Sequence, residues 1–132
     1  MRNLKRIGTV LMAMALVFTW NLTAFAAVED TGFSDVAVDA WYADAVAYVR
    51  DNGLMGGTSA ATFEPDGAMT RAMLAATVYR AAGSPAVSGT DSFTDTADGA
   101  WYADAVLWAA RQGIISGYGN GLFGPGDPVS RE

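Results

Sequence analysis

The sequence contains no cysteine and no histidine, and its one lysine, Lys5, lies in the first few residues. Without these side chains the chain offers no disulfide, no thiol nucleophile and no imidazole general base. Paired carboxylates can also cleave glycosides, but no pair of acids stands out here by its spacing. The Asp-rich stretches FSDVAVDA and FTDTADGA lack the alternating oxygen ligands and final Glu of a calcium loop. We therefore expect no enzyme, no cofactor and no metal site.

The first 26 residues are typical of a secretory signal peptide. Basic residues at positions 2, 5 and 6 precede an apolar run over 7–18, and Ala24-Phe25-Ala26 has the pattern of a cleavage site. The run is shorter than the roughly 20 residues that span a bilayer, which favours cleavage over a membrane anchor. We expect export, with 1–26 removed and 27–32 left as a short N-terminal segment.

Basic residues are scarce beyond this leader. Five arginines stand against fourteen acids, which gives the mature segment a net charge of −9. Nucleic acids and anionic lipid surfaces both require a basic footprint, so we expect neither as a partner after cleavage. A mature segment of about a hundred residues without disulfides must be stabilised by packing around a modest core.

The heptapeptide AWYADAV occurs at positions 40–46 and again at 100–106. With a shift of sixty positions, residues 33–72 align with 93–132 without a gap. The identical pairs include Phe33/Phe93, Asp35/Asp95, Trp41/Trp101, Tyr42/Tyr102, Asp44/Asp104, Gly53/Gly113, Gly57/Gly117, Phe63/Phe123, Pro65/Pro125 and Arg71/Arg131. A duplication of this period indicates a supersecondary unit that buries its apolar face against its copies. We place the first unit at 33–83, a linker at 84–92 and an incomplete second unit at 93–132.

Each unit is predicted to be a helix–loop–helix, so the fold class is mainly all-α. The first helix is expected over 41–52, opened near Asp39 and ended by Gly53, since glycine adopts positive φ without strain. Its buried face is expected to comprise Trp41, Ala45, Tyr48 and Val49. The equivalent helix of the second unit is expected over 101–112, ended by Gly113.

The second helix of the first unit is predicted over 71–82, with Thr70 as its N-cap and Gly83 at its end. Its apolar residues are Met73, Leu74, Thr77, Val78 and Ala81. Ser130 is the equivalent N-cap in the second unit.

Five ordered motifs, each present twice, resemble the S-layer homology module. They are FSDV and FTDT, AWYADAV, GLMGG and GIISG, FEP and FGP, and MTR and VSR. The resemblance covers 33–83 and 93–132. It implies modules that usually occur in threes, form a pseudo-trimeric helical head and anchor exported proteins to the cell wall. It also implies binding of secondary cell-wall polysaccharide, often through a pyruvate ketal on an amino sugar, in grooves between modules.

The resemblance also implies site residues for carbohydrate binding. The family's arginine, in a T-R-A-E segment, is a principal ligand contact, and a Trp, an early Asp and a Gly of the loop lie near the groove. In this sequence these positions are Arg71, Trp41, Asp35 and Gly57 in the first unit, and Arg131, Trp101, Asp95 and Gly117 in the second.

The position of Arg71 has a physical rationale as well. A helix N-terminus offers free backbone N–H groups and a partial positive charge, and a guanidinium beside it can hold a carboxylate by two hydrogen bonds. Met73 stands where the family commonly has Glu or Gln, so the capping box with Thr70 is incomplete. We expect this to loosen the helix N-terminus by about 0.5–1 kcal/mol.

Structural roles compete with ligand contact at the other positions. Trp41 and Trp101 are expected to pack chiefly in the core, with an edge free to line a groove. Asp35 and Asp95 are expected to stabilise turns or caps, and the glycines to meet demands of backbone geometry.

The sequence favours a non-catalytic anchoring module at the surface of a bacterium, binding a pyruvylated or otherwise anionic wall polysaccharide. The alternative is a structural association module that pairs with other such modules and binds no glycan itself. Because the chain ends inside a motif that should open a helix, we expect a fragment of a longer protein. The missing helix should leave Trp101, Val106 and Trp108 partly uncovered, which predicts marginal stability or self-association.

Overall fold

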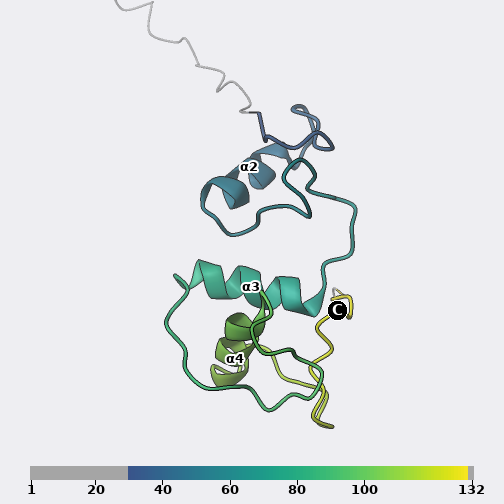
Figure 1. The fold of residues 1–132 in the computed structure, drawn as a ribbon. Helices are drawn as coiled ribbons and strands as arrows, with labels where there is room; N and C mark the ends of the chain where they lie inside the picture. The colour runs from purple at the N-terminus through teal and green to yellow at the C-terminus, as the bar shows by residue number, and fades with distance from the viewer. Residues whose placement is uncertain (1–29, 131–132) are drawn as a thin grey trace, which may run out of the picture.

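The computed structural model describes residues 30–130, so the signal peptide predicted over 1–26 and Arg131 lie outside the described residues. Within 30–130 the chain forms α2 (Ala43–Asp51), α3 (Arg71–Ala81) and α4 (Ala103–Arg111), joined by loops (Figure 1). The described part contains no strand, only an isolated antiparallel bridge between Thr70 and Pro128. The predicted helical class is confirmed. No helix in this range has the length and apolar character needed to cross a membrane.

The ends of the helices follow local signals in the chain. The Thr70 hydroxyl accepts a hydrogen bond from the Met73 amide at 3.3 Å, so Thr70 is the predicted N-cap of α3. Gly53, Gly83 and Gly113 follow the three helices with φ of 66°, 83° and 68°, as predicted for left-handed helix ends.

The first helix of each repeat begins two residues later than predicted. Tyr42 and Tyr102 are the residues before α2 and α4, and neither makes a side-chain capping bond. The Trp-Tyr pairs lie in turns, held by amide-to-carbonyl bonds such as Ala43 N–H to the Ala40 oxygen at 2.9 Å. Asp39 therefore does not open the helix.

Helix α3 belongs to the first repeat by sequence but packs on α4 of the second repeat. No other pair of helices in the described range is in contact, and Figure 1 shows α2 apart from the α3–α4 pair. The shared core is rich in alanine, which lets the two helix backbones approach closely. Its buried members are Ala75, Ala76, Ala105, Val106, Ala109, Ile115 and Phe123.

This cross-repeat packing corrects the prediction of an uncovered face on α4. Val106 is fully buried, and the Trp108 ring lies 5.6 Å from the ring of Tyr79 in α3. The helix of the preceding repeat therefore covers the surface that we expected to lack a partner. Of the three residues named for that face, only Trp101 is largely exposed.

The buried faces of the helices also differ from those predicted. Helix α2 buries Ala43 and Val46, whereas Trp41, Ala45 and Tyr48 are exposed. Together with Phe33 and Val36, the two buried residues of α2 form a second, smaller core. Helix α3 fully buries Ala72, Ala75 and Ala76, while its larger apolar residues are only partly covered.

Candidate functional site

The early aspartate of each repeat binds the backbone of the F-x-P segment. Asp35 accepts hydrogen bonds from the amides of Phe63 and Glu64 at 2.9 and 2.7 Å. Asp95 makes the same pair of bonds sixty positions later, both at 2.7 Å. The bonds to backbone amides hold the pKa of both carboxyl groups below the ordinary value, because they favour the ionised form. The predicted role of the two aspartates in stabilising turns is confirmed, and the backbone that each one holds lies 28–29 positions further along the chain.

The two loop glycines are required by close packing. A Cβ at Gly57 would lie 2.5 Å from the Thr62 carbonyl oxygen and 2.7 Å from the ring of Phe33. A Cβ at Gly117 would lie 2.7 Å from the Leu122 carbonyl oxygen. The prediction that these glycines serve backbone geometry is confirmed.

The side chain of Arg71 crosses from the first repeat into the second. Its Nε donates to the Phe123 carbonyl at 2.8 Å, and its Nη2 donates to the Ser116 carbonyl at 2.6 Å. The guanidinium also lies over the rings of Tyr118 and Phe123, 4.8 and 4.9 Å from their centroids. Because Ser116 precedes Gly117 and Asp95 binds the Phe123 amide, Arg71 meets two predicted site residues at this junction.

The backbone amides at the start of α3 are already paired. The Arg71 amide donates to the Asp127 carbonyl at 2.9 Å, and the Ala72 amide donates to the Pro125 carbonyl at 3.1 Å. With the Met73 amide on Thr70, the first turn has no free donor for an anion. A ligand carboxylate at this point would have to be bound by side chains, and the bonds to the second repeat offset the loose terminus expected from Met73.

The two tryptophans are not core residues. Trp41 is 93% exposed and Trp101 62% exposed, so the prediction that both pack chiefly in the core was wrong. The physical reason is that both precede the helix, and each ring lies edge-on against the following tyrosine, at centroid distances of 5.4 and 5.2 Å. An exposed indole is available to a ligand, which favours the other role considered for these residues.

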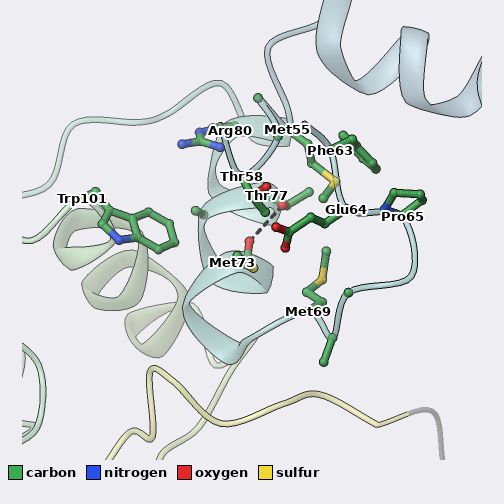
Figure 2. Close-up of a pocket in the computed structure, with 15 residues that line it drawn as sticks. Met55, Thr58, Phe63, Glu64, Pro65, Met69, Met73, Thr77, Arg80 and Trp101 are labelled. Carbon is green, nitrogen blue, oxygen red and sulfur yellow. Dashed lines mark hydrogen bonds between the residues drawn. The ribbon is translucent and has the colours of Figure 1, made fainter. Parts of the chain in front are cut away.

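A groove of about 660 Å³ crosses the exposed face of α3, between the 55–58 loop, the 63–69 segment and Trp101. Figure 2 shows Met73, Thr77 and Arg80 on this face of α3, with Trp101 on one side and Glu64 on the other. Most of its surface is apolar, with Met55, Met69, Met73, Phe63 and Pro65 in its lining. Thr58, Thr77, Glu64 and Arg80 supply the polar groups.

Two residues of the groove, Thr58 and Gly67, are smaller than their counterparts in the second repeat, Tyr118 and Asp127. In the second repeat, the Tyr118 hydroxyl donates to Asp127 at 2.8 Å. The same bond, together with desolvation, raises the pKa of Tyr118. Thr58 and Gly67 stand sixty positions earlier, and neither can form this bond with the other.

The eight predicted site residues therefore fall into separate places. Three of them, Arg71, Asp95 and Gly117, lie at the junction of the repeats. Gly57 and Trp101 line the groove, and Asp35 binds the backbone of residues 63–64 beside it. Trp41 is outside the groove, and Arg131 is outside the described residues. Sequence reasoning missed Glu64 and Arg80. The available signal for Glu64 was its difference from Gly124 at the equivalent position. No group of three or more potential metal ligands occurs within 30–130.

Comparison with known proteins identifies the family. The sequence model of the S-layer homology domain matches residues 32–73 and 92–132, which together make up more than half of the chain. The chain belongs to the S-layer homology domain family. Domains of this family are non-catalytic, are located at the cell surface, typically act as surface anchors and bind cell-wall polymers. The predicted cell-surface location is confirmed.

Relatives of the chain include surface proteins and an enzyme. It is 35% identical over 130 residues to a cell surface protein of Thermoanaerobacter kivui, covering 95% of this chain and 17% of that protein. It is 30% identical over 134 residues to the surface-layer 125 kDa protein of Lysinibacillus sphaericus, covering 98% and 11%. An amylopullulanase of Thermoanaerobacterium thermosulfurigenes is 31% identical over 130 residues, covering 96% and 7%. The chain thus spans less than a fifth of the length of these relatives, and no solved structure gave a significant match.

Proposed function

We propose that this module holds its protein at the bacterial cell wall by binding a secondary cell-wall polysaccharide, a polymer of pyruvylated amino sugar. The observation that carries the proposal is the meeting of Arg71 with the Asp95 and Gly117 region across the junction of two repeats. The junction combines a guanidinium, an ionised carboxylate and aromatic rings, the mixture of polar and apolar groups that ligand sites usually have.

Arg71 is the ligand contact in this proposal. Its Nε and Nη2 bind protein carbonyls, and these two bonds together with two aromatic rings fix the orientation of the guanidinium. Nη1 makes no hydrogen bond within the described residues and donates to the pyruvyl carboxylate. Since the mature segment carries a net charge of −9, attraction of an acidic polymer acts at short range rather than by long-range steering.

Sedimentation with purified wall sacculi tests the role of Arg71. We expect the mature wild-type protein to sediment with sacculi and Arg71→Ala to lose at least about tenfold in affinity, since a charge-assisted hydrogen bond contributes about 1.5–3 kcal/mol. Circular dichroism of both proteins checks that the variant is folded, because Arg71 also joins the repeats. Equal retention of two folded proteins would exclude Arg71 as the contact, and no retention of either would refute wall binding by this module.

Association between modules is the second candidate, and the packing of α3 on α4 favours it. Helix α3 of the first repeat packs on α4 of the second, so a helix of one molecule can pack in the same way on a repeat of another molecule. In this candidate a helix of one module packs on a repeat of another module, as α3 packs on α4. Sedimentation velocity without walls tests it: a concentration-dependent rise in mass supports association, and a monomer at all concentrations excludes it.

A further inference from the structure

Tyr118 of the second repeat contacts two opposite charges with two different parts of its side chain. The Cζ atom of Arg71 lies 4.8 Å from the centroid of the Tyr118 ring. The Tyr118 hydroxyl donates to Oδ2 of Asp127 at 2.8 Å. The guanidinium therefore lies over the face of the ring, while the carboxylate is bound at its edge.

Arg71 and Asp127 are also joined through the backbone, yet their side chains form no ion pair. The Arg71 amide donates to the Asp127 carbonyl at 2.9 Å, beside the bridge between Thr70 and Pro128. Within 30–130 the one salt bridge joins Arg50 to its neighbour Asp51. Two opposite charges that contact the same tyrosine thus stay apart, which needs a physical reason.

The hydrogen bond from Tyr118 supplies that reason. A phenol that donates to a carboxylate makes a short, charge-assisted bond, whereas an exposed ion pair gains little because water screens it. The bond also raises the pKa of Tyr118 above the ordinary value of 10.0, because the neutral phenol is the form that donates to Asp127. At neutral pH the hydroxyl therefore keeps its proton and competes with Arg71 for the carboxylate.

The fold makes room for the Tyr118–Asp127 pair in the second repeat. A Cβ at Gly124 would collide with Asp127 and with the Tyr118 ring, and the φ of Gly124 is 71°. All three positions differ together in the first repeat, where the equivalent residues are Thr58, Glu64 and Gly67. The pair is thus present in the repeat that the Arg71 side chain enters.

The donor that matters here is Nη1 of Arg71. Nε and Nη2 are already bound to the carbonyl groups of Phe123 and Ser116. Two carboxylates border the guanidinium, and each is bound by other donors: Asp95 by two backbone amides and Asp127 by Tyr118. A protein carboxylate on Nη1 would occupy the same donor as an acidic ligand.

We infer that Tyr118 is a positioning residue for Arg71, with a separate task for each part of its side chain. The ring fixes the guanidinium, and the hydroxyl holds the Asp127 carboxylate away from Nη1, so that this donor stays open to an acidic ligand. Without the hydroxyl, Asp127 pairs with Arg71 and competes with the ligand. The inference rests on the proposed function, in which Arg71 is the ligand contact.

NMR of the arginine side chains in the mature protein, without any ligand, tests the arrangement itself. Tyr118→Phe keeps the ring under the guanidinium and removes the hydroxyl. We expect it to shift the Nε–H signal of Arg71, assigned by its loss in Arg71→Lys, and to slow exchange of the guanidinium protons with water. The double variant Tyr118→Phe with Asp127→Asn should restore the wild-type signal, because the competing charge is gone.

Sedimentation with wall sacculi then tests the consequence for binding. Tyr118→Phe should lose about fivefold in affinity, the effect of competition by one exposed ion pair, and the double variant should regain it. A purely structural role of the hydroxyl would not be rescued by removing a second contact. Tyr48→Phe is the matched control: Tyr48 is 63% exposed against 54% for Tyr118, and its hydroxyl has no hydrogen bond within the described residues. It should change neither measurement.

An Arg71 signal that is the same in Tyr118→Phe and the wild type would overturn the inference. A shift that persists in the double variant would also overturn it, because the hydroxyl would then act by another route than Asp127. The expected NMR changes without retention of any of these proteins, the wild type included, would support the arrangement of the three side chains and refute the proposed function alone.

Discussion

At the residue scale, the conformation of Glu64 makes a stability prediction. Glu64→Gly should stabilise the fold by about 1 kcal/mol, because glycine adopts a φ of 59° without steric cost. Thermal unfolding measures the change. Gly124→Ala is the opposite control, since a Cβ at Gly124 would collide with Tyr118 and Asp127 and should lower stability. An unchanged or lower midpoint for Glu64→Gly would mean that the glutamate is not strained.

The aspartates predict a pH dependence of stability. The pKa of Asp95 is lowered in the folded protein by hydrogen bonds from backbone amides, first that of Phe123, and also by the positive charge of Arg71. A group with a depressed folded pKa stabilises the fold above its unfolded pKa of about 3.9, and this contribution is lost as the pH falls through the lower folded pKa. Stability should therefore decrease below about pH 4.

Replacement of the carboxylate tests this source of acid sensitivity. Asp95→Asn should be less stable than the wild type at pH 7, and its stability should vary less between pH 4 and pH 2. The control Asp98→Asn removes an exposed carboxylate that makes no hydrogen bond within the described residues. Urea unfolding at a series of pH values measures both. Identical pH profiles for Asp95→Asn and the wild type would contradict the assignment.

At the scale of elements, the sequence predicted where the helices lie better than it predicted which of their faces are buried and against which element. Thr70 and the three terminating glycines are local signals, and the structure has each helix end where they indicate. The buried faces could not be read in this way, because alanine is neutral in an apolar pattern and gives no period. Ala75 is buried because α3 packs on α4, and Trp41 is exposed because no helix of the described range packs against it. Such contacts between distant segments are not determined by the repeat in the sequence.

The α3–α4 contact predicts a large penalty for a larger side chain. Ala75 is fully buried between these helices, whereas Ala81 at the end of α3 is exposed. Ala75→Leu should destabilise the protein by about 1–3 kcal/mol, because the added carbons force the helices apart. Ala81→Leu should change stability by less than about 0.5 kcal/mol. Urea unfolding distinguishes them, and similar midpoints would contradict the packing of α3 on α4.

At the scale of the whole molecule, the two cores differ in size. The core around α3 and α4 has seven buried residues, and the one around α2 has four and no second helix within the described range. Local opening costs less where fewer apolar contacts are broken. Amides of α2 should therefore exchange with solvent at least about tenfold faster than those of α4, a difference of about 1.4 kcal/mol. Hydrogen exchange measures this, and uniform protection would contradict it.

The candidate site shows the same limit of sequence reasoning on this scale. The repeat and its motifs led to Arg71, Asp95 and Gly117, which meet at the junction because both repeats fold alike. They also led to Gly57 and Trp101, which line the groove, but not to Glu64, where the two repeats differ, or to Arg80.

Binding to sacculi before and after removal of pyruvate is the most direct test of the proposed anchoring function. Mild acid removes the ketal and its carboxylate while the rest of the wall stays in place. We predict that the mature protein sediments with untreated sacculi and loses at least about tenfold in affinity for treated ones, since a charged hydrogen-bond partner has been removed. Equal retention by both preparations would contradict recognition of a pyruvylated polysaccharide.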